Sequence, residues 1–126
     1  MSQLILHLIG DYLLQSDWMA LHKTRCHKAA AAHALVYSLP FLILQPSFAA
    51  WFVIFITHFF IDRYRLAKYV GVIRSRLAPK NLRPKWCDCK ETGYHKDTPP
   101  HLSTWLMIIT DNTLHLTINF LALTYL

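Results

Sequence analysis

Residues 51–62 read Trp-Phe-Val-Ile-Phe-Ile-Thr-His-Phe-Phe-Ile-Asp, an apolar run that ends in a histidine and an aspartate four positions apart. On an α-helix, residues four apart lie on the same face, one turn above the other. A carboxylate placed alone at the centre of a lipid bilayer costs about 2.5–3.5 kcal/mol. The run therefore predicts an apolar helix with one polar stripe, which must face other helices that carry matching polar groups.

Two further segments carry the same kind of pair. His7 and Asp11 lie in an apolar N-terminal segment, and Asp111 and His115 lie in an apolar C-terminal segment. Another histidine, His33, follows an alanine-rich stretch. A helical bundle that turns all of these stripes inward would satisfy the carboxylates together.

Turn and capping residues divide the chain into these helices. Proline at position 46 ends one apolar segment, Ser47 is a suitable N-cap for the next, and the prolines at 99 and 100 precede the last. The expected fold is all-α, a membrane-embedded four-helix bundle formed by a single integral domain over residues 1–126. The expected helices cover residues 2–22, 27–45, 47–77 and 101–125, with one long loop over residues 78–100.

The charge distribution predicts how these helices cross the membrane. Hydrophobic residues make up 54% of the chain, and the net charge of +6 comes from Lys and Arg gathered in two connections. The first connection carries Lys23, Arg25 and Lys28, and the second is the basic end of the third segment with the 78–100 loop. An excess of Lys and Arg is typical of loops that face the cytoplasm. We therefore expect a multi-pass protein of the inner membrane with a cytoplasmic 78–100 loop and both termini non-cytoplasmic, and no nucleic-acid partner.

The repeated His/Asp pairs predict a metal site between the helices. Imidazole nitrogen and carboxylate oxygen suit divalent transition metals, so zinc is expected, with manganese or iron as alternatives. One ion with outer His–Asp contacts and two ions that share a bridging carboxylate both remain open. Structural His–Asp hydrogen bonds between helices are the non-metal alternative. The expected ligands are His7, Asp11, His33, His58, Asp62, Asp111 and His115.

Two other groups suggest further sites. Arg63 and Arg65 follow the aspartate of the third helix, where a guanidinium could hold a phosphate or simply anchor the helix at the membrane surface. Cys87, Cys89 and His95 in the long loop could bind a second zinc ion. A single Cys-x-Cys without a second pair is a weak signal, so an ordinary loop is favoured.

The same motifs link the chain to a family. They are the segments 7–17, 57–62 and 110–115, together with His33. With them the chain resembles, over nearly its whole length, a group of small phage and bacterial membrane proteins, the domain-of-unknown-function family 3307. This resemblance implies a membrane location and a viral or prophage origin, and it supplies no activity. More loosely, the pattern is similar to bacterial inner-membrane metal-dependent hydrolases, in which histidines and aspartates on membrane helices bind the metal.

The sequence therefore predicts an enzyme, a metal-dependent hydrolase that acts on a lipid-linked phosphate or a phospholipid. A metal ion would lower the pKa of a bound water to about 7. Whichever of Asp11, Asp62 and Asp111 does not bind the metal would serve as general base, and Arg63 or Arg65 would bind the phosphate.

Two other functions remain open. A non-enzymatic, metal-stabilised phage protein could bind or block a host membrane protein through the basic loop. An intramembrane metallopeptidase is less favoured, because such enzymes usually need a glutamate base. The only glutamate here is Glu91, outside the expected helices, and there is no His-Glu-x-x-His motif. The sequence leaves the substrate, the metal and the oligomeric state undetermined.

Overall fold

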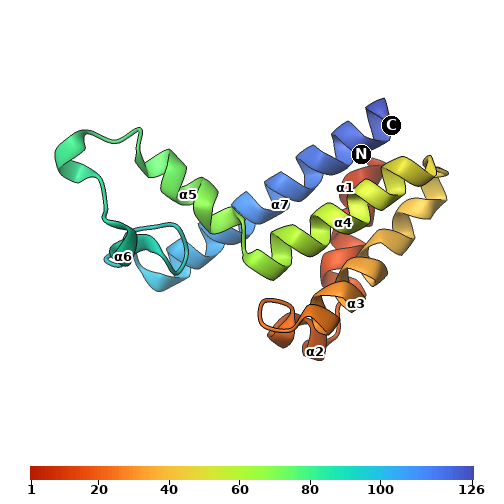
Figure 1. The fold of residues 1–126 in the computed structure, drawn as a ribbon, viewed down its shortest axis with the longest axis horizontal. Helices are drawn as coiled ribbons and strands as arrows, with labels where there is room; N and C mark the ends of the chain where they lie inside the picture. The colour runs from red at the N-terminus through yellow and green to blue at the C-terminus, as the bar shows by residue number, and fades with distance from the viewer. The chain divides into compact units, whose positions relative to one another are not determined.

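The computed structural model describes residues 1–126 and contains helices and turns but no strand, which confirms the all-α prediction. The chain forms two compact units. Unit 1 consists of Met1–Tyr64 and His115–Leu126, and unit 2 consists of Arg65–Leu114. Figure 1 labels the helices of both units in chain order.

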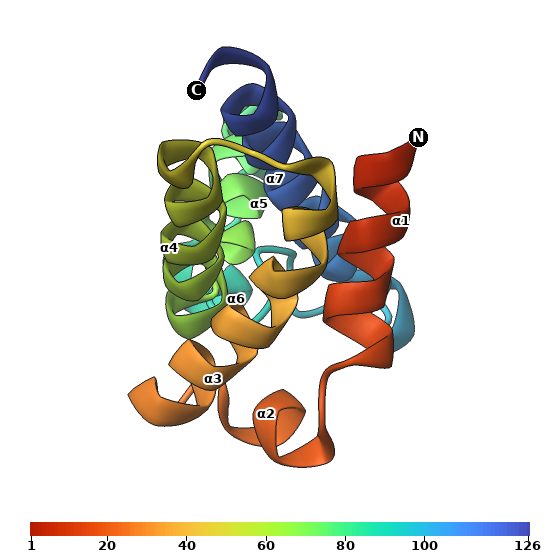
Figure 2. The same cartoon turned by 90° about the vertical axis from the view of Figure 1, so that its right-hand side faces the viewer.

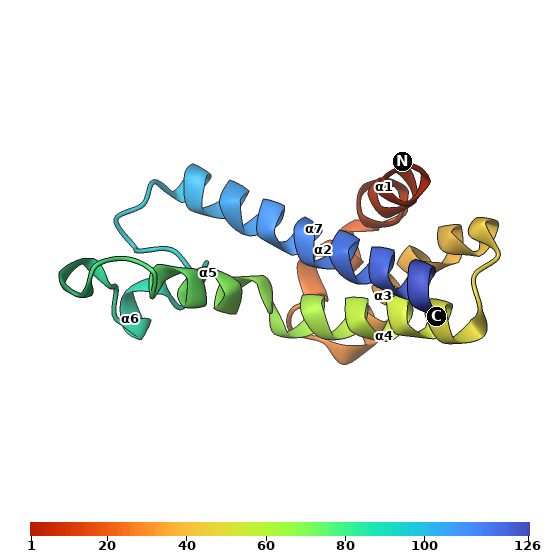
Figure 3. The same ribbon diagram turned by 90° about the horizontal axis from the view of Figure 1, so that it is seen from above.

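Unit 1 is built from three long helical segments, one short helix and the C-terminal part of α7. Helix α1 (Ser2–Leu8) continues through a π-helical stretch, Ile9–Leu13, and α2 (Asp17–His22) follows. Helix α3 (His27–Ser38) leads through a 3-10 stretch, Leu39–Leu44, to α4 (Phe48–Tyr64). Helices α3 and α4 pack side by side, and α3 also contacts the π-helical stretch (Figures 2 and 3). Residues on α3 thus face both α1 and α4.

The predicted helix over residues 2–22 is interrupted. It leaves the helical conformation after the π-helical stretch, and a new helix begins behind Ser16, whose backbone is extended. The Ser16 hydroxyl accepts a hydrogen bond from the Met19 amide at 3.4 Å, and Asp17 occupies the first turn. A serine cap followed by an acidic residue favours a helix start. The local capping preference of this serine therefore breaks the apolar segment.

The predicted helix over residues 47–77 is also divided. The Ser47 hydroxyl accepts from the Ala50 amide at 3.0 Å, which confirms Ser47 as the N-cap. Helix α4 then ends at Tyr64, because Arg65 adopts a left-handed conformation with a φ of 51°. In the predicted 27–45 helix, Pro40 lacks an amide proton, so the α-helix gives way to a 3-10 stretch.

Gly10 lies where the π-helical stretch meets α3. A Cβ atom on this residue would lie 2.7 Å from Cδ2 and 2.9 Å from the carbonyl oxygen of Tyr37. Only glycine allows so close an approach of the two backbones. This contact positions the next residue, Asp11, toward α3.

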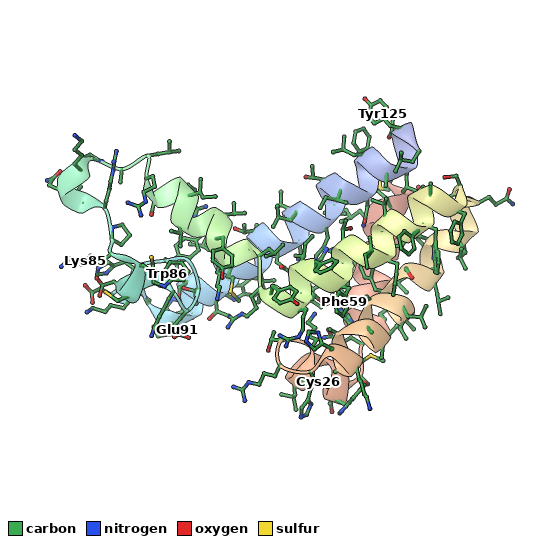
Figure 4. All side chains as sticks on the ribbon, in the orientation of Figure 1. Cys26, Phe59, Lys85, Trp86, Glu91 and Tyr125 are labelled. Carbon is green, nitrogen blue, oxygen red and sulfur yellow. The ribbon has the colours of Figure 1, made fainter.

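Unit 2 contains α5 (Ala67–Ser75), a 3-10 turn at Lys80–Leu82, α6 (Trp86–Cys89) and the N-terminal part of α7 (Pro100–Tyr125). The predicted loop over residues 78–100 therefore includes two short helical turns. It folds onto α5 through Gly93, whose φ is 82° and which lies against the Lys68 carbonyl. Trp86 of α6, labelled in Figure 4, stacks on Tyr69 of α5 with ring centroids 5.7 Å apart.

Two helical segments are long and apolar enough to cross a membrane, judged by length and composition. They are His27–Leu44 and Pro100–Tyr125. Helix α4 has 17 residues, at the lower limit of about 17–25 for a spanning helix. A membrane bundle of four spanning helices therefore remains a prediction, as do the single integral domain, the multi-pass arrangement and the non-cytoplasmic termini.

Candidate metal centre

Unit 1 buries an unusual set of polar side chains between its helices. Six ionisable residues on the predicted polar stripes are each no more than 7% exposed. They are His7, Asp11, His33, His58, Asp62 and His115. The spacing of four in the pairs 7/11 and 58/62 turns each pair to one side of its segment, as predicted.

Four of these residues converge on one point, and we call Asp11, His33, His58 and Asp62 the ligand cluster. The Nε2 atoms of His33 and His58 lie 3.0 Å apart. Oδ1 of Asp11 lies 3.1 Å from the His33 nitrogen and 3.4 Å from the His58 nitrogen. Oδ2 of Asp62 lies 3.0 Å and 3.2 Å from the same two nitrogens. These side chains come from the π-helical stretch, α3 and α4.

One linear hydrogen bond per ring nitrogen does not account for this crowding. A neutral imidazole nitrogen has either one proton or one lone pair, so it forms one hydrogen bond. Nε2 of His33 nevertheless has three cluster atoms within 3.1 Å. Ligand atoms about 2.0–2.1 Å from one tetrahedral ion lie about 3.3–3.4 Å apart. The cluster spacing is close to this, and all four atoms lie within 4.8 Å of one another. The cluster could therefore hold a metal ion.

His7 and His115 contact the outer sides of the two aspartates. Nδ1 of His7 lies 3.5 Å from Oδ2 of Asp11, and Nε2 of His115 lies 3.4 Å from Oδ1 of Asp62. Residues in this position typically orient ligating carboxylates. The geometry thus gathers four residues around one point and places one histidine beside each aspartate, whereas the sequence predicted all six as ligands. Their assignment as ligands stays a prediction.

Tyr37 and Asn119 belong to the same buried network, and the sequence analysis missed both. The Tyr37 ring stacks on His58 with centroids 3.6 Å apart and an interplanar angle of 15°. Its hydroxyl accepts a hydrogen bond from Nδ2 of Asn119 at 2.7 Å and lies 2.9 Å from Nδ1 of His7. Tyr37 follows His33 by one helical turn, so the spacing of four that marked the other pairs could have indicated it.

Lys23 was also missed as a site residue, because it was assigned to a basic loop. Its ammonium lies 2.9 Å from Oδ2 of Asp62 and 3.2 Å from Nε2 of His33. The side chain is 20% exposed. It therefore extends from the α2–α3 connection into the ligand cluster.

The other predicted site residues are Asp111, Arg63 and Arg65, and the role of Asp111 as a ligand stays a prediction. Asp111 is on α7 in unit 2, one turn before His115. The Arg63 guanidinium donates to the Thr24 carbonyl at 2.7 Å, and that of Arg65 contacts Sδ of Met107 at 3.3 Å. The two arginines therefore bind neighbouring structure, and a phosphate-binding role for them stays a prediction.

The three residues of the second zinc site suggested in the long loop do not form a group that could hold a metal ion in this structure. The Cys89 thiol is buried and donates to the Lys85 carbonyl at 3.3 Å, whereas Cys87 is exposed. Burial raises the pKa of the Cys89 thiol, which opposes the thiolate that zinc requires. His95 pairs with Asp97 at 3.2 Å, and no metal-capable group includes these three residues.

Replacing Tyr37 by phenylalanine is expected to lower the free energy of unfolding by about 1–3 kcal/mol, because the buried Asn119 amide loses its acceptor. The stacked ring over His58 is retained. Denaturation in detergent measures the loss, and Tyr125→Phe is the control, since Tyr125 is 74% exposed at the end of α7 (Figure 4). Equal stability of the two variants would contradict the role of the hydroxyl.

Comparison with known proteins identifies the chain at the level of its family. No curated protein and no solved structure matches it. A match to the family described as Protein of unknown function (DUF3307) extends over residues 1–126, which confirms the resemblance inferred from the His/Asp motifs. Neither an enzymatic activity nor a bound metal follows from this membership. The chain belongs to the DUF3307 family.

Proposed function

We propose that the chain is a membrane-embedded, metal-dependent hydrolase that acts on a lipid-linked phosphate or a phospholipid. The observation that carries this proposal is the ligand cluster, in which two imidazole nitrogens lie 3.0 Å apart and each lies 3.0–3.4 Å from one oxygen of both carboxylates. Such a group of donors binds zinc, manganese or iron.

The surface of unit 1 supports a membrane location. Leu13, Ile43 and Phe48 are 76–77% exposed, and further leucines and phenylalanines of α1, α3 and α4 are about half exposed. Soluble monomers rarely expose large contiguous apolar patches. The same surface is compatible with lipid, whereas the six ionisable residues of the site are buried between the helices.

The residues of the site have distinct proposed roles. A bound divalent ion supplies Lewis acidity and an activated water at neutral pH. His33 and His58 hold the ion with Asp11 and Asp62, and His7 and His115 fix the orientation of the two carboxylates. A predicted aspartate that does not bind the ion would accept the proton of the attacking water.

One observation favours a second function. The four cluster residues are only 0–7% exposed. Closed sites are typical of structural metals, whereas catalytic sites keep a position open to water and substrate. The alternative is therefore a metal-stabilised membrane protein without catalysis, which binds or blocks a host membrane protein.

Metal analysis and turnover on the same sample test these proposals. We expect purified protein in detergent to contain about one or two transition-metal ions per chain, as a mono- or dinuclear site requires. A chelator should remove the metal and abolish the release of phosphate from phosphatidic acid or a polyprenyl phosphate. Added zinc or manganese should restore both the metal content and the activity. His33→Ala should lose the metal, and the exposed His101→Ala is the matched control.

The possible outcomes separate the two functions. Stoichiometric metal without turnover of any lipid phosphate would favour the structural role. Metal absent from the wild-type protein, or retained equally in His33→Ala, would overturn both proposals.

A further inference from the structure

Lys23 is the one ammonium group that reaches the ligand cluster through the contacts described above. Its Nζ lies 2.9 Å from Oδ2 of Asp62 and 3.2 Å from Nε2 of His33. Both atoms belong to the set that could hold a metal ion. Lys23 follows α2 directly, in the short connection to α3.

The ammonium and a metal ion compete for the same lone pair. A neutral imidazole nitrogen has one lone pair, and at 3.2 Å Nε2 of His33 can accept a hydrogen bond from Lys23 only by using it. The same lone pair must bind the ion if His33 is a ligand. An ion about 2.0–2.2 Å from Oδ2 of Asp62 would also lie within about 5 Å of the ammonium, where the two like charges repel.

The structure of the α2–α3 connection allows the Lys23 side chain to move away from the cluster while the connection stays folded. The Arg63 guanidinium holds the neighbouring Thr24 carbonyl at 2.7 Å, and the Lys23 amide bonds the Met19 carbonyl at 2.8 Å. The backbone on both sides of Lys23 is thus tied to α2 and α4. The flexible lysine stem can move while its Cα atom stays beside the cluster.

We propose that the Lys23 ammonium is the binding group for the phosphate of the substrate, held by Asp62 and His33 in the metal-free protein and released when the metal binds. The inference rests on the proposed metal site, and it names the group that recognises the anion. Neither Arg63 nor Arg65 is required in this role. The Lys23 side chain contacts the buried cluster and is also partly exposed to the surroundings of the protein.

Amine labelling of the wild-type protein tests this in three states. An N-hydroxysuccinimide ester should modify Lys23 slowly in metal-free protein and at least about tenfold faster after zinc loading, because the ammonium then leaves its two acceptors. Inorganic phosphate added to zinc-loaded protein should slow the modification again. Lys28, which is exposed in the next helix, is the internal reference in each mass spectrum.

Lys23→Met provides the second measurement. We expect this variant to bind zinc about tenfold more tightly, because the competing ammonium is gone. We also expect the zinc-loaded variant to lose affinity for inorganic phosphate, as measured by calorimetry. Lys28→Met should change neither quantity. Labelling of Lys23 that is unaffected by zinc, or unchanged zinc and phosphate affinities in Lys23→Met, would overturn the proposal.

Failure of the metal site itself gives a different result. If the wild-type protein binds no zinc in a titration, that outcome rejects both the proposed function and the proposed release of Lys23 by the metal. If the wild-type protein binds zinc but the reactivity of Lys23 stays constant, only the proposed role of Lys23 is rejected.

Discussion

Asp62→Asn is expected to abolish stoichiometric metal binding and to lower the free energy of unfolding by about 3–5 kcal/mol. The Asp62 carboxylate contacts the Lys23 ammonium at 2.9 Å, His33 at 3.0 Å and His58 at 3.2 Å through one oxygen. Its other oxygen lies 3.4 Å from His115. Asparagine keeps the size of the side chain but leaves the half-buried Lys23 ammonium without its charged partner.

Elemental analysis and denaturation in detergent measure these two effects. The matched control is Asp97→Asn, because Asp97 also pairs with a histidine, His95, but its side chain is 79% exposed. An exposed pair of this kind contributes at most about 1 kcal/mol. If Asp62→Asn has the same metal content and the same stability as Asp97→Asn, a central role for Asp62 is contradicted.

Gly10→Ala is expected to weaken metal binding although position 10 carries no ligand. The added methyl group would meet both the ring and the backbone carbonyl of Tyr37, at 2.7 Å and 2.9 Å. A backbone atom cannot rotate away, so the π-helical stretch must move from α3. Overpacking of this kind costs about 1–3 kcal/mol, and the movement carries the adjacent Asp11 away from His33.

Zinc affinity and the free energy of unfolding should therefore fall together in Gly10→Ala. Gly93→Ala serves as the control, because Gly93 has a φ of 82° and lies against the Lys68 carbonyl within unit 2. This second variant should lose at least about 1–2 kcal/mol of stability through backbone strain and a clash with the Lys68 carbonyl, while it keeps the zinc affinity of unit 1. Wild-type zinc affinity in Gly10→Ala would show that the close approach does not position Asp11.

The interruptions of the predicted helices show where hydropathy alone is insufficient. The predicted helices run through Ser16 and Arg65 without a break, yet a new helix starts behind the first and the helix ends before the second. Ser16 carried a recognisable capping signal that the apolar periodicity outweighed. Arg65 carried none, because arginine is a good helix former and its left-handed conformation depends on its surroundings.

The sequence by itself determined the all-α class, the family, and six residues that are buried together in the candidate site. Helical spacing is local, so four positions between a histidine and an aspartate place both on one face wherever the helix lies. Burial of charge in an apolar chain then requires those faces to meet. His7, Asp11, His33, His58, Asp62 and His115 follow from these two facts and are all buried in unit 1.

Only the tertiary structure decided how these residues divide their contacts. It separates the four cluster residues from the outer histidines, and it brings in Tyr37, Asn119 and Lys23. The Asn119–Tyr37 bond joins residues 82 positions apart, and the Lys23–Asp62 pair joins a loop to α4. Such contacts depend on how helices approach one another, as the close packing at Gly10 does, and no local pattern specifies that approach.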